Sequence, residues 1–192
     1  MTKYILASGS PRRIDMMRAH GLNPLIFPAD VDETLPPGLG MEEAVKFLAE
    51  KKARAAEEKS LRAGVSGFGD ILIAADTVVY KDGIMGKPSC RQDAFDMLTK
   101  IKNTNHYVAT GVAIIKVGES YANIFCDVTE VFCKDYSDDE INAYLDTEEP
   151  YDKAGAYAIQ GLFAKHIDHY EGDFNTVVGF PWDRIAAVLK ML

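Results

Sequence analysis

The segment from Ile71 to Tyr80 constrains the fold most, because it is an apolar run that holds a carboxylate at its centre. Such a run is typical of a buried strand. Sheet packing gives no reason for Asp76 at that place, and burying an unpaired carboxylate is costly. The sequence therefore predicts a buried strand in which a metal ion or a lysine satisfies Asp76.

Helix and strand patterns alternate along the rest of the chain, which predicts an α/β fold. Residues 118–120 look like the turn of a β-hairpin, so the sheet is expected to be mixed rather than purely parallel. Neither a G-x-G-x-x-G pattern nor a Walker A sequence occurs. The expected helices are one that begins at Pro11 and others over about 41–61, 91–101, 138–146 and 182–192; the expected strands are 3–7, 71–80, 106–117, 121–133 and 155–167.

The charge balance excludes some classes of partner. The 192 residues carry 21 basic and 29 acidic side chains, and the net charge of −8 disfavours wrapping a long nucleic acid, although a local pocket for one small anion is compatible with it. No apolar run approaches the roughly 20 residues of a membrane helix. Three cysteines, Cys90, Cys126 and Cys133, form no C-x-x-C pair. We therefore expect a soluble, cytoplasmic protein that does not bind membranes.

Residues 8–13 have the composition of a phosphate cradle. A strand, a small turn and a helix that begins at Pro11 would place backbone N–H groups and about half a positive charge at one point. The hydroxyls of Ser8 and Ser10 and the guanidiniums of Arg12 and Arg13 lie beside it in the sequence. The alternative is a plain helix cap at Ser10 with two solvated arginines.

Two lysines stand out by their position. Lys52 falls in the middle of an apolar helical stripe, where it either extends its amine to solvent or is held for an anion at the edge of the core. A two-residue turn at 82–83 would pair Lys87 with Val78 and bring it within roughly 7–8 Å of Asp76. That pair is either part of a site or a structural ion pair. The stripe consists of Met41, Ala44, Val45, Leu48, Ala55 and Ala56.

Two glycine-containing segments lie near the C-terminal end. In residues 150–161 the glycines allow close backbone approach, and Gln160 offers a donor and acceptors that suit the edge of a nucleotide base. Residues 172–181 form a glycine-bounded turn and the start of a helix, which by themselves indicate only structure.

Several spaced motifs run the length of the chain in a fixed order. They are 6–13, Asp32-Glu33, Leu48-Ala49 with Lys52-Ala53, 75–78, Lys87-Pro88, 152–157 with 159–161, and 177–181. Together they resemble the Maf family of nucleoside triphosphate pyrophosphatases. The resemblance covers the whole chain, so a single domain over 1–192, with two lobes around a central cleft, is expected.

The resemblance implies an elongated, two-lobed mixed sheet with flanking helices, similar to the fold of the inosine triphosphate pyrophosphatases. It implies cleavage between the α and β phosphates, a divalent metal ion such as Mg²⁺ or Mn²⁺, a cytoplasmic setting and frequent homodimers. Asp76 matches the position of the catalytic base. Arg12, Thr77 and Gln160 match positions at which Arg, Thr and Gln accompany a preference for dTTP and UTP.

These expectations combine into a mechanistic hypothesis. Asp76 activates water and, with Glu33, holds the metal ion; Arg13, Lys52 and Lys87 clamp the phosphates, and Ser8 and Ser10 donate hydrogen bonds. The alternatives are a pyrophosphatase for modified purine nucleotides such as 7-methyl-GTP, and a nucleotide-binding regulator of cell division without catalysis. The chain departs from the family pattern at residues 102–106 and 173–175, which concerns loops near the site.

Overall fold

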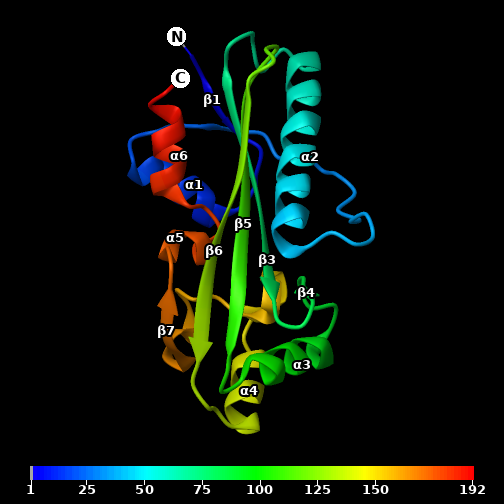
Figure 1. The fold of residues 1–192 in the computed structure, drawn as a ribbon, viewed down its shortest axis with the longest axis vertical. Helices are drawn as coiled ribbons and strands as arrows, with labels where there is room; N and C mark the ends of the chain where they lie inside the picture. Colours follow the sequence, from blue (N-terminus) through cyan, green and yellow to red (C-terminus); the bar gives the residue numbers. More distant parts are fainter. Residues whose placement is uncertain (1) are drawn as a thin grey trace. The chain divides into compact units, whose positions relative to one another are not determined.

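We describe residues 2–192 from a computed structural model. The chain alternates strands and helices, as predicted; they are labelled in Figure 1. In order, the elements are β1 (Tyr4–Leu6), α1 (Pro11–Ala19), β2 (Leu25–Ile26), α2 (Met41–Arg62), β3 (Ile71–Tyr80), β4 (Ile84–Met85), α3 (Arg91–Ile101), β5 (Asn105–Lys116), β6 (Ala122–Cys133), α4 (Asp138–Leu145), the short 3-10 turns η1 (Pro150–Asp152), η2 (Ala154–Ala156) and η3 (Leu162–His166), β7 (Ile167–Glu171), α5 (Phe174–Val178) and α6 (Trp182–Leu189).

The strands form one mixed sheet in the order β2-β1-β3-β5-β6-β7, with β4 attached to β3. Strand β1 runs parallel to both β2 and β3, whereas β4 is antiparallel to β3 and β7 is antiparallel to β6. The predicted α/β class with a mixed sheet and flanking helices is therefore confirmed. None of the helices within residues 2–192 combines the length and the apolar character that a bilayer crossing requires.

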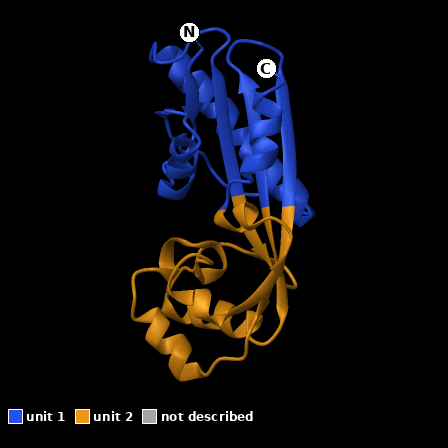
Figure 2. Cartoon of the chain, turned by 90° about the vertical axis from the view of Figure 1, so that its left-hand side faces the viewer, with its two compact units in different colours: residues 1–76, 110–127, 179–192 blue, residues 77–109, 128–178 orange. Residues whose placement is uncertain are grey.

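The chain divides into two compact units, coloured separately in Figure 2. The first unit comprises residues 1–76, 110–127 and 179–192, and the second comprises 77–109 and 128–178. Strands β3, β5 and β6 each contribute residues to both units. The single domain with two lobes around a cleft, which the resemblance implies, stays a prediction.

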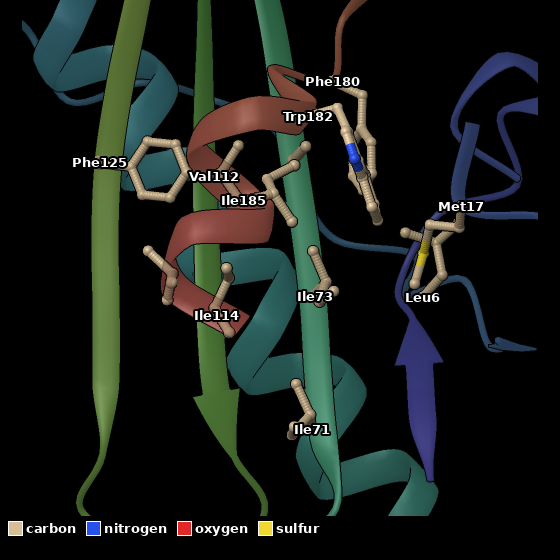
Figure 3. Close-up of a cluster of buried hydrophobic side chains, with 12 residues drawn as sticks. Leu6, Met17, Ile71, Ile73, Val112, Ile114, Phe125, Phe180, Trp182 and Ile185 are labelled. Carbon is tan, nitrogen blue, oxygen red and sulfur yellow. The ribbon is translucent and has the colours of Figure 1, made fainter. Parts of the chain in front are cut away.

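The core of the first unit lies on both faces of its strands. Because alternate residues of a strand point to opposite faces, Ile71 and Ile73 pack with α1 and α6, as Figure 3 shows, whereas Leu72 and Ala74 pack against the alanines of α2. Burying each large aliphatic side chain contributes about 1.5–3 kcal/mol. Both faces of β3 are therefore apolar, which explains the continuous apolar run.

The second unit has an aromatic core. The rings of Tyr136, Tyr144 and Tyr157 pack around Phe163, with centroid distances of 5.4, 5.1 and 5.3 Å respectively. The phenol of Tyr157 lies 2.7 Å from Nε2 of His106, which is completely buried. Helix α4 begins with a capping box, in which Ser137 and Glu140 exchange side-chain and backbone hydrogen bonds.

The predicted strand over residues 155–167 is wrong. This segment forms the turns η2 and η3, and only Ile167–Glu171 is a strand. Gly155 and Ala156 have φ values of 67° and 60°, which place both in the left-handed region and prevent an extended conformation. The apolar side chains of this segment pack into the aromatic core although its backbone is irregular. Their buried, apolar character was therefore mistaken for that of a strand.

The predicted register of the β3–β4 hairpin is wrong by one residue. Val79 pairs with Met85 and Tyr80 with Ile84, so the connection has three residues, 81–83, instead of the two that were expected. Asp82 has a φ of 50° and the Lys81 N–H donates to Gly83 O at 3.0 Å, which accommodates the additional residue. Lys87 lies beyond the end of β4 and is not opposite Val78.

Candidate active site

Asp76 lies where the alternation of β3 directs it toward α2. It follows Leu72 and Ala74 on the face that packs against that helix, and only 7% of its surface is exposed. Lys52 projects from α2, and its Nζ lies 2.5 Å from Oδ1 of Asp76. The carboxylate in the apolar strand is therefore satisfied by a lysine, which is one of the two predicted solutions.

Lys52 also binds a second carboxylate. Its Nζ lies 2.7 Å from Oε1 of Glu33, although 59% of the Glu33 side chain is exposed against 14% for Lys52. The loop that carries Glu33 is ordered locally, since Oδ1 of Asp32 accepts hydrogen bonds from the N–H and the hydroxyl of Thr34. Two carboxylates thus converge on one ammonium. The alternative, in which Lys52 only extends its amine to solvent, is therefore wrong.

Arg13 connects three segments of the first unit. Its Nε donates to the carbonyl of Gly179 at 2.9 Å, and its Nη1 donates to the carbonyl of Ala75 at 2.6 Å and to the Ser8 hydroxyl at 3.3 Å. The Ala75 carbonyl belongs to the peptide group that leads into Asp76, so Arg13 braces the backbone directly beside this carboxylate. The alternative of a solvated Arg13 is therefore excluded.

The charges around Arg13 form one electrostatic environment. Burial lowers the pKa of Arg13 to about 10, the charges of Asp76 and Glu33 oppose this shift, and the charge of Arg12 adds to it. With this pKa the guanidinium stays protonated at neutral pH. The first unit therefore gathers two arginines, one lysine and two carboxylates in a small region.

The turn before α1 supplies polar donors to the same region. Ser8 is 9% exposed, and its hydroxyl accepts a hydrogen bond from the Ser10 N–H at 3.2 Å as well as from Arg13. Ser10 is the N-cap residue and Pro11 follows it, as predicted, but the Ser10 side chain makes no capping hydrogen bond. Pro11 has no backbone N–H, and the Ile14 N–H donates to the Ser10 carbonyl at 3.2 Å, so the polar groups of this turn are bound locally.

The donor set bears on the implied metal ion. Across residues 2–192, no group of three or more His, Cys, Asp or Glu side chains is arranged to hold a metal. The carboxylates of Asp76 and Glu33 do meet at one cation, Lys52, and oxygen ligands suit Mg²⁺. Because Mg²⁺ commonly uses one or two carboxylates together with substrate phosphates, these two residues fit a metal that arrives with a nucleotide.

The remaining predicted site residues belong to the second unit. Thr77 directly follows Asp76 in β3 and is half-buried, whereas Lys87 and Gln160 are exposed. Lys87 follows Gly86, whose carbonyl accepts a hydrogen bond from the Gly155 N–H at 3.0 Å. Gln160 lies in a turn that is closed by the Gly161 N–H and the Ala158 carbonyl, 3.1 Å apart.

The departures from the family pattern have structural explanations. Asn103 adopts a φ of 53°, a conformation that asparagine tolerates better than most residues. Asp173 precedes α5 and accepts a hydrogen bond from the Asn175 N–H at 2.9 Å, as a helix cap does.

One polar cluster in the second unit was missed. Lys81 donates to Thr104 Oγ1 at 2.9 Å and to Asn105 Oδ1 at 3.4 Å, and Asn105 in turn donates to Glu130. In the sequence, Lys81 is recognisable only as part of a turn. Its partners Thr104 and Asn105 lie 23 and 24 residues further along the chain, so no local pattern connects them.

Known proteins resemble this chain along its whole length. The chain is 44% identical over 195 residues to the dTTP/UTP pyrophosphatase of Caldicellulosiruptor saccharolyticus, covering 100% of this chain and 96% of the relative. It is 41% identical to the dTTP/UTP pyrophosphatase of Acetivibrio thermocellus, covering 99% and 95%. A solved structure, that of the Staphylococcus aureus Ham1 protein, has a TM-score of 0.53 and 13% identity over 98% of both chains, a likeness that shows the fold.

A family model covers nearly the whole chain. The model of the Maf-like proteins matches residues 3–192, a range that includes every predicted site residue. The motifs that carried the resemblance in the sequence all lie inside this match. The chain therefore belongs to the Maf family.

Proposed function

We propose that the protein hydrolyses dTTP and UTP to the nucleoside monophosphate and pyrophosphate. The observation that carries the proposal is the convergence of Asp76 and Glu33 on Lys52 beside the guanidinium of Arg13. A carboxylate pair is unfavourable near a polyphosphate unless cations intervene, and this arrangement supplies them. The relatives named above are dTTP/UTP pyrophosphatases, which supports the same reaction here.

Asp76 is the proposed general base. A base must be held in position for a water molecule that attacks the α phosphorus. The contact with Lys52 fixes one carboxylate oxygen of Asp76, and the Arg13 bond to the Ala75 carbonyl fixes the backbone next to it. Both contacts restrict the carboxylate to one orientation, so little reorganisation is needed when the substrate binds.

The cationic side chains are proposed to neutralise the triphosphate. Arg13, Lys52 and Lys87 are assigned to the phosphates, with the hydroxyls of Ser8 and Ser10 as neutral donors. Asp76 and Glu33 would hold Mg²⁺ or Mn²⁺, which supplies further charge neutralisation on the phosphate oxygens when bound. The residues of the protein orient the attacking water and hold the triphosphate in one position.

Selection of the base is assigned to Arg12, Thr77 and Gln160. The amide of Gln160 can donate to one carbonyl of uracil or thymine and accept from the ring N–H. Arg12 and Thr77 add further donors to the same edge of the nucleotide. Cytosine presents the opposite pattern at positions 3 and 4. Discrimination against it is assigned to a Gln160 amide held in one orientation and to Arg12, which offers donors only.

The proposal is tested by pyrophosphate release from a panel of canonical and modified triphosphates, with and without Mg²⁺ or Mn²⁺. We expect metal-dependent release chiefly from dTTP and UTP. Release chiefly from 7-methyl-GTP or another modified purine would keep the reaction but contradict the assigned base readers. Tight nucleotide binding without any release would contradict the enzyme and favour a non-catalytic regulator.

A homodimer and a cytoplasmic location are carried forward from the family resemblance as predictions. Sedimentation of the purified protein tests the first, because a mass near 21.2 kDa identifies a monomer and twice that mass a dimer. Fractionation of cells tests the second.

A further inference from the structure

The turn that carries Gln160 is held by side chains from outside the turn. Its own hydrogen bond, from the Gly161 N–H to the Ala158 carbonyl, closes it at 3.1 Å. Gln160 itself is exposed. An exposed residue on a short turn has a defined position only when the backbone on either side of it is fixed.

Glu149 provides this fixation on one side. Its Oε2 accepts a hydrogen bond from the Leu162 N–H at 3.0 Å, and its Oε1 accepts one from the Tyr144 hydroxyl at 2.9 Å. Both carboxylate oxygens are thus engaged, one by the turn and one by the aromatic core. A backbone N–H that donates to a carboxylate is among the stronger hydrogen bonds in proteins.

Tyr144 connects Glu149 to the aromatic core. It is buried, and burial, followed by the contact with Glu149, raises the pKa of its hydroxyl. Tyr144 belongs to α4 and packs its ring against Phe163, at a centroid distance of 5.1 Å. Leu162, at one end of the turn, is therefore connected to the aromatic core through Glu149 and Tyr144.

Gly161 is the residue that admits Glu149. A Cβ atom at this position would lie 2.1 Å from Oε2 and 2.2 Å from Oε1 of Glu149. Any side chain there would therefore displace the carboxylate from its place. Gly161, the glycine next to Gln160, is therefore needed because it lets a carboxylate approach the backbone closely, and not only because it makes the turn flexible.

We infer that Glu149 is a positioning residue for base selection, because it clamps the 158–162 turn and so sets the place of Gln160. The inference rests on the proposed function, since it assigns Glu149 to the base-reading part of that reaction. Glu149 acts through Gln160 and does not itself contact the nucleotide. Loss of the clamp therefore weakens recognition of uracil and thymine more than it slows the chemical step.

The experiment compares steady-state kinetics for dTTP, UTP and CTP in wild type and variants, together with amide hydrogen exchange at Leu162. Glu149→Ala should raise the KM for dTTP and UTP about tenfold, with a smaller change in kcat and a reduced preference for UTP over CTP. Exchange at Leu162 should accelerate about tenfold or more. Gly161→Ala should have the same effects, because it displaces the carboxylate without removing it.

Three further variants separate positioning from a general loss of structure. Glu149→Gln keeps an oxygen for the Leu162 N–H and an amide for the Tyr144 hydroxyl, so its KM should stay near that of wild type. Glu148→Ala removes the exposed neighbouring carboxylate and should change nothing. In a Gln160→Ala background, Glu149→Ala should change the UTP preference less than twofold, because both act on one contact.

The results that overturn the inference differ from those that overturn the base assignment. Unchanged exchange at Leu162 in Glu149→Ala means that there is no clamp, whatever the kinetics show. Accelerated exchange with an unchanged UTP preference, while Gln160→Ala alters that preference, means that the clamp has no role in selection. If Gln160→Ala leaves the preference unchanged, the base-reading role of Gln160 is wrong, and the positioning role of Glu149 is wrong with it.

Discussion

The ammonium of Lys52 lies 2.5 Å from Oδ1 of Asp76, although α2 and β3 bring these residues together from 24 positions apart in the chain. Both side chains are largely buried, at 14% and 10% exposure. Burial of either charge without the other would be strongly unfavourable. This one ion pair therefore explains two unusual positions: a carboxylate inside an apolar strand and a cation inside an apolar helical stripe.

Asp76→Asn should abolish turnover while the fold persists. The amide oxygen can still accept a hydrogen bond from Lys52, but an amide cannot take a proton from water, so kcat should fall by about 10²–10⁴. Nucleotide affinity should change far less. Pyrophosphate release and nucleotide binding by calorimetry measure the two effects, and a kcat close to that of wild type would exclude Asp76 as the base.

Lys52→Met should reduce both activity and stability. The substitution leaves two carboxylates, Asp76 and Glu33, near each other without their shared cation, and breaking such a buried pair costs about 3 kcal/mol. Urea unfolding and pyrophosphate release measure the two losses. Lys51→Met is the matched control, since Nζ of Lys51 lies 5.7 Å from the centroid of the exposed Phe47 ring and contacts neither carboxylate. Equal losses of activity and stability in the two variants would contradict the role assigned to Lys52.

His106 should make the protein less stable in mild acid. Burial, and secondly the charge of Lys81, lower the pKa of His106 to about 4 from 6.5. Between these values the unfolded chain binds the proton that the folded protein excludes, so stability falls as the pH decreases through this window. The full effect is on the order of 3 kcal/mol, of which about 2 kcal/mol is lost by pH 5.

Urea unfolding of wild type and His106→Gln at pH 7 and pH 5 measures this effect. Glutamine retains donors and acceptors for the Tyr157 hydroxyl but does not titrate. All other ionisable groups are common to both proteins, so their contributions cancel in the comparison. An identical loss of stability in the two proteins between pH 7 and pH 5 would contradict a neutral, buried His106.

Gly155→Ala should destabilise the protein more than Gly64→Ala. Both glycines have a φ of 67°, so both substitutions carry the same left-handed strain of about 1 kcal/mol. A Cβ at Gly155 would lie 2.8 Å from Cγ2 of Val79, whereas nothing lies within 4 Å of one at Gly64. The steric conflict should add about 1–3 kcal/mol in urea unfolding, and equal costs would show that the contact with β3 relaxes freely.

The parts of the site that depend on local patterns could be predicted from the sequence. Ser10 and Pro11 mark the start of a helix, the stripe on α2 singles out Lys52 over Lys51, and the apolar run isolates Asp76. Each of these is a property of one element, and the periodicity of helix or strand is enough to reveal it. The partner of Asp76 was predicted as a lysine or a metal, and the expected hairpin register placed Lys87 near it, whereas the lysine in contact is Lys52.

The parts that depend on backbone geometry and on distant contacts could not be predicted. The left-handed conformation of Ala156 ends any strand in its segment, yet no sequence rule places alanine there. The additional residue in the β3–β4 turn depends on the left-handed Asp82. The contact of Glu149 with Leu162 arises from the packing of α4 against the 3-10 turns, and a lone glutamate in a loop gives no indication of it.

The most direct test of the account is hydrolysis of dTTP in water enriched in ¹⁸O, followed by mass spectrometry of both products. If Asp76 directs water to the α phosphorus, the label appears in dTMP and the pyrophosphate carries none. Glu33→Gln should retain the position of the label even where it lowers the rate, because this carboxylate is assigned to the metal ion. Label in the pyrophosphate, or release of orthophosphate, would contradict attack at the α phosphorus and with it the assigned role of Asp76.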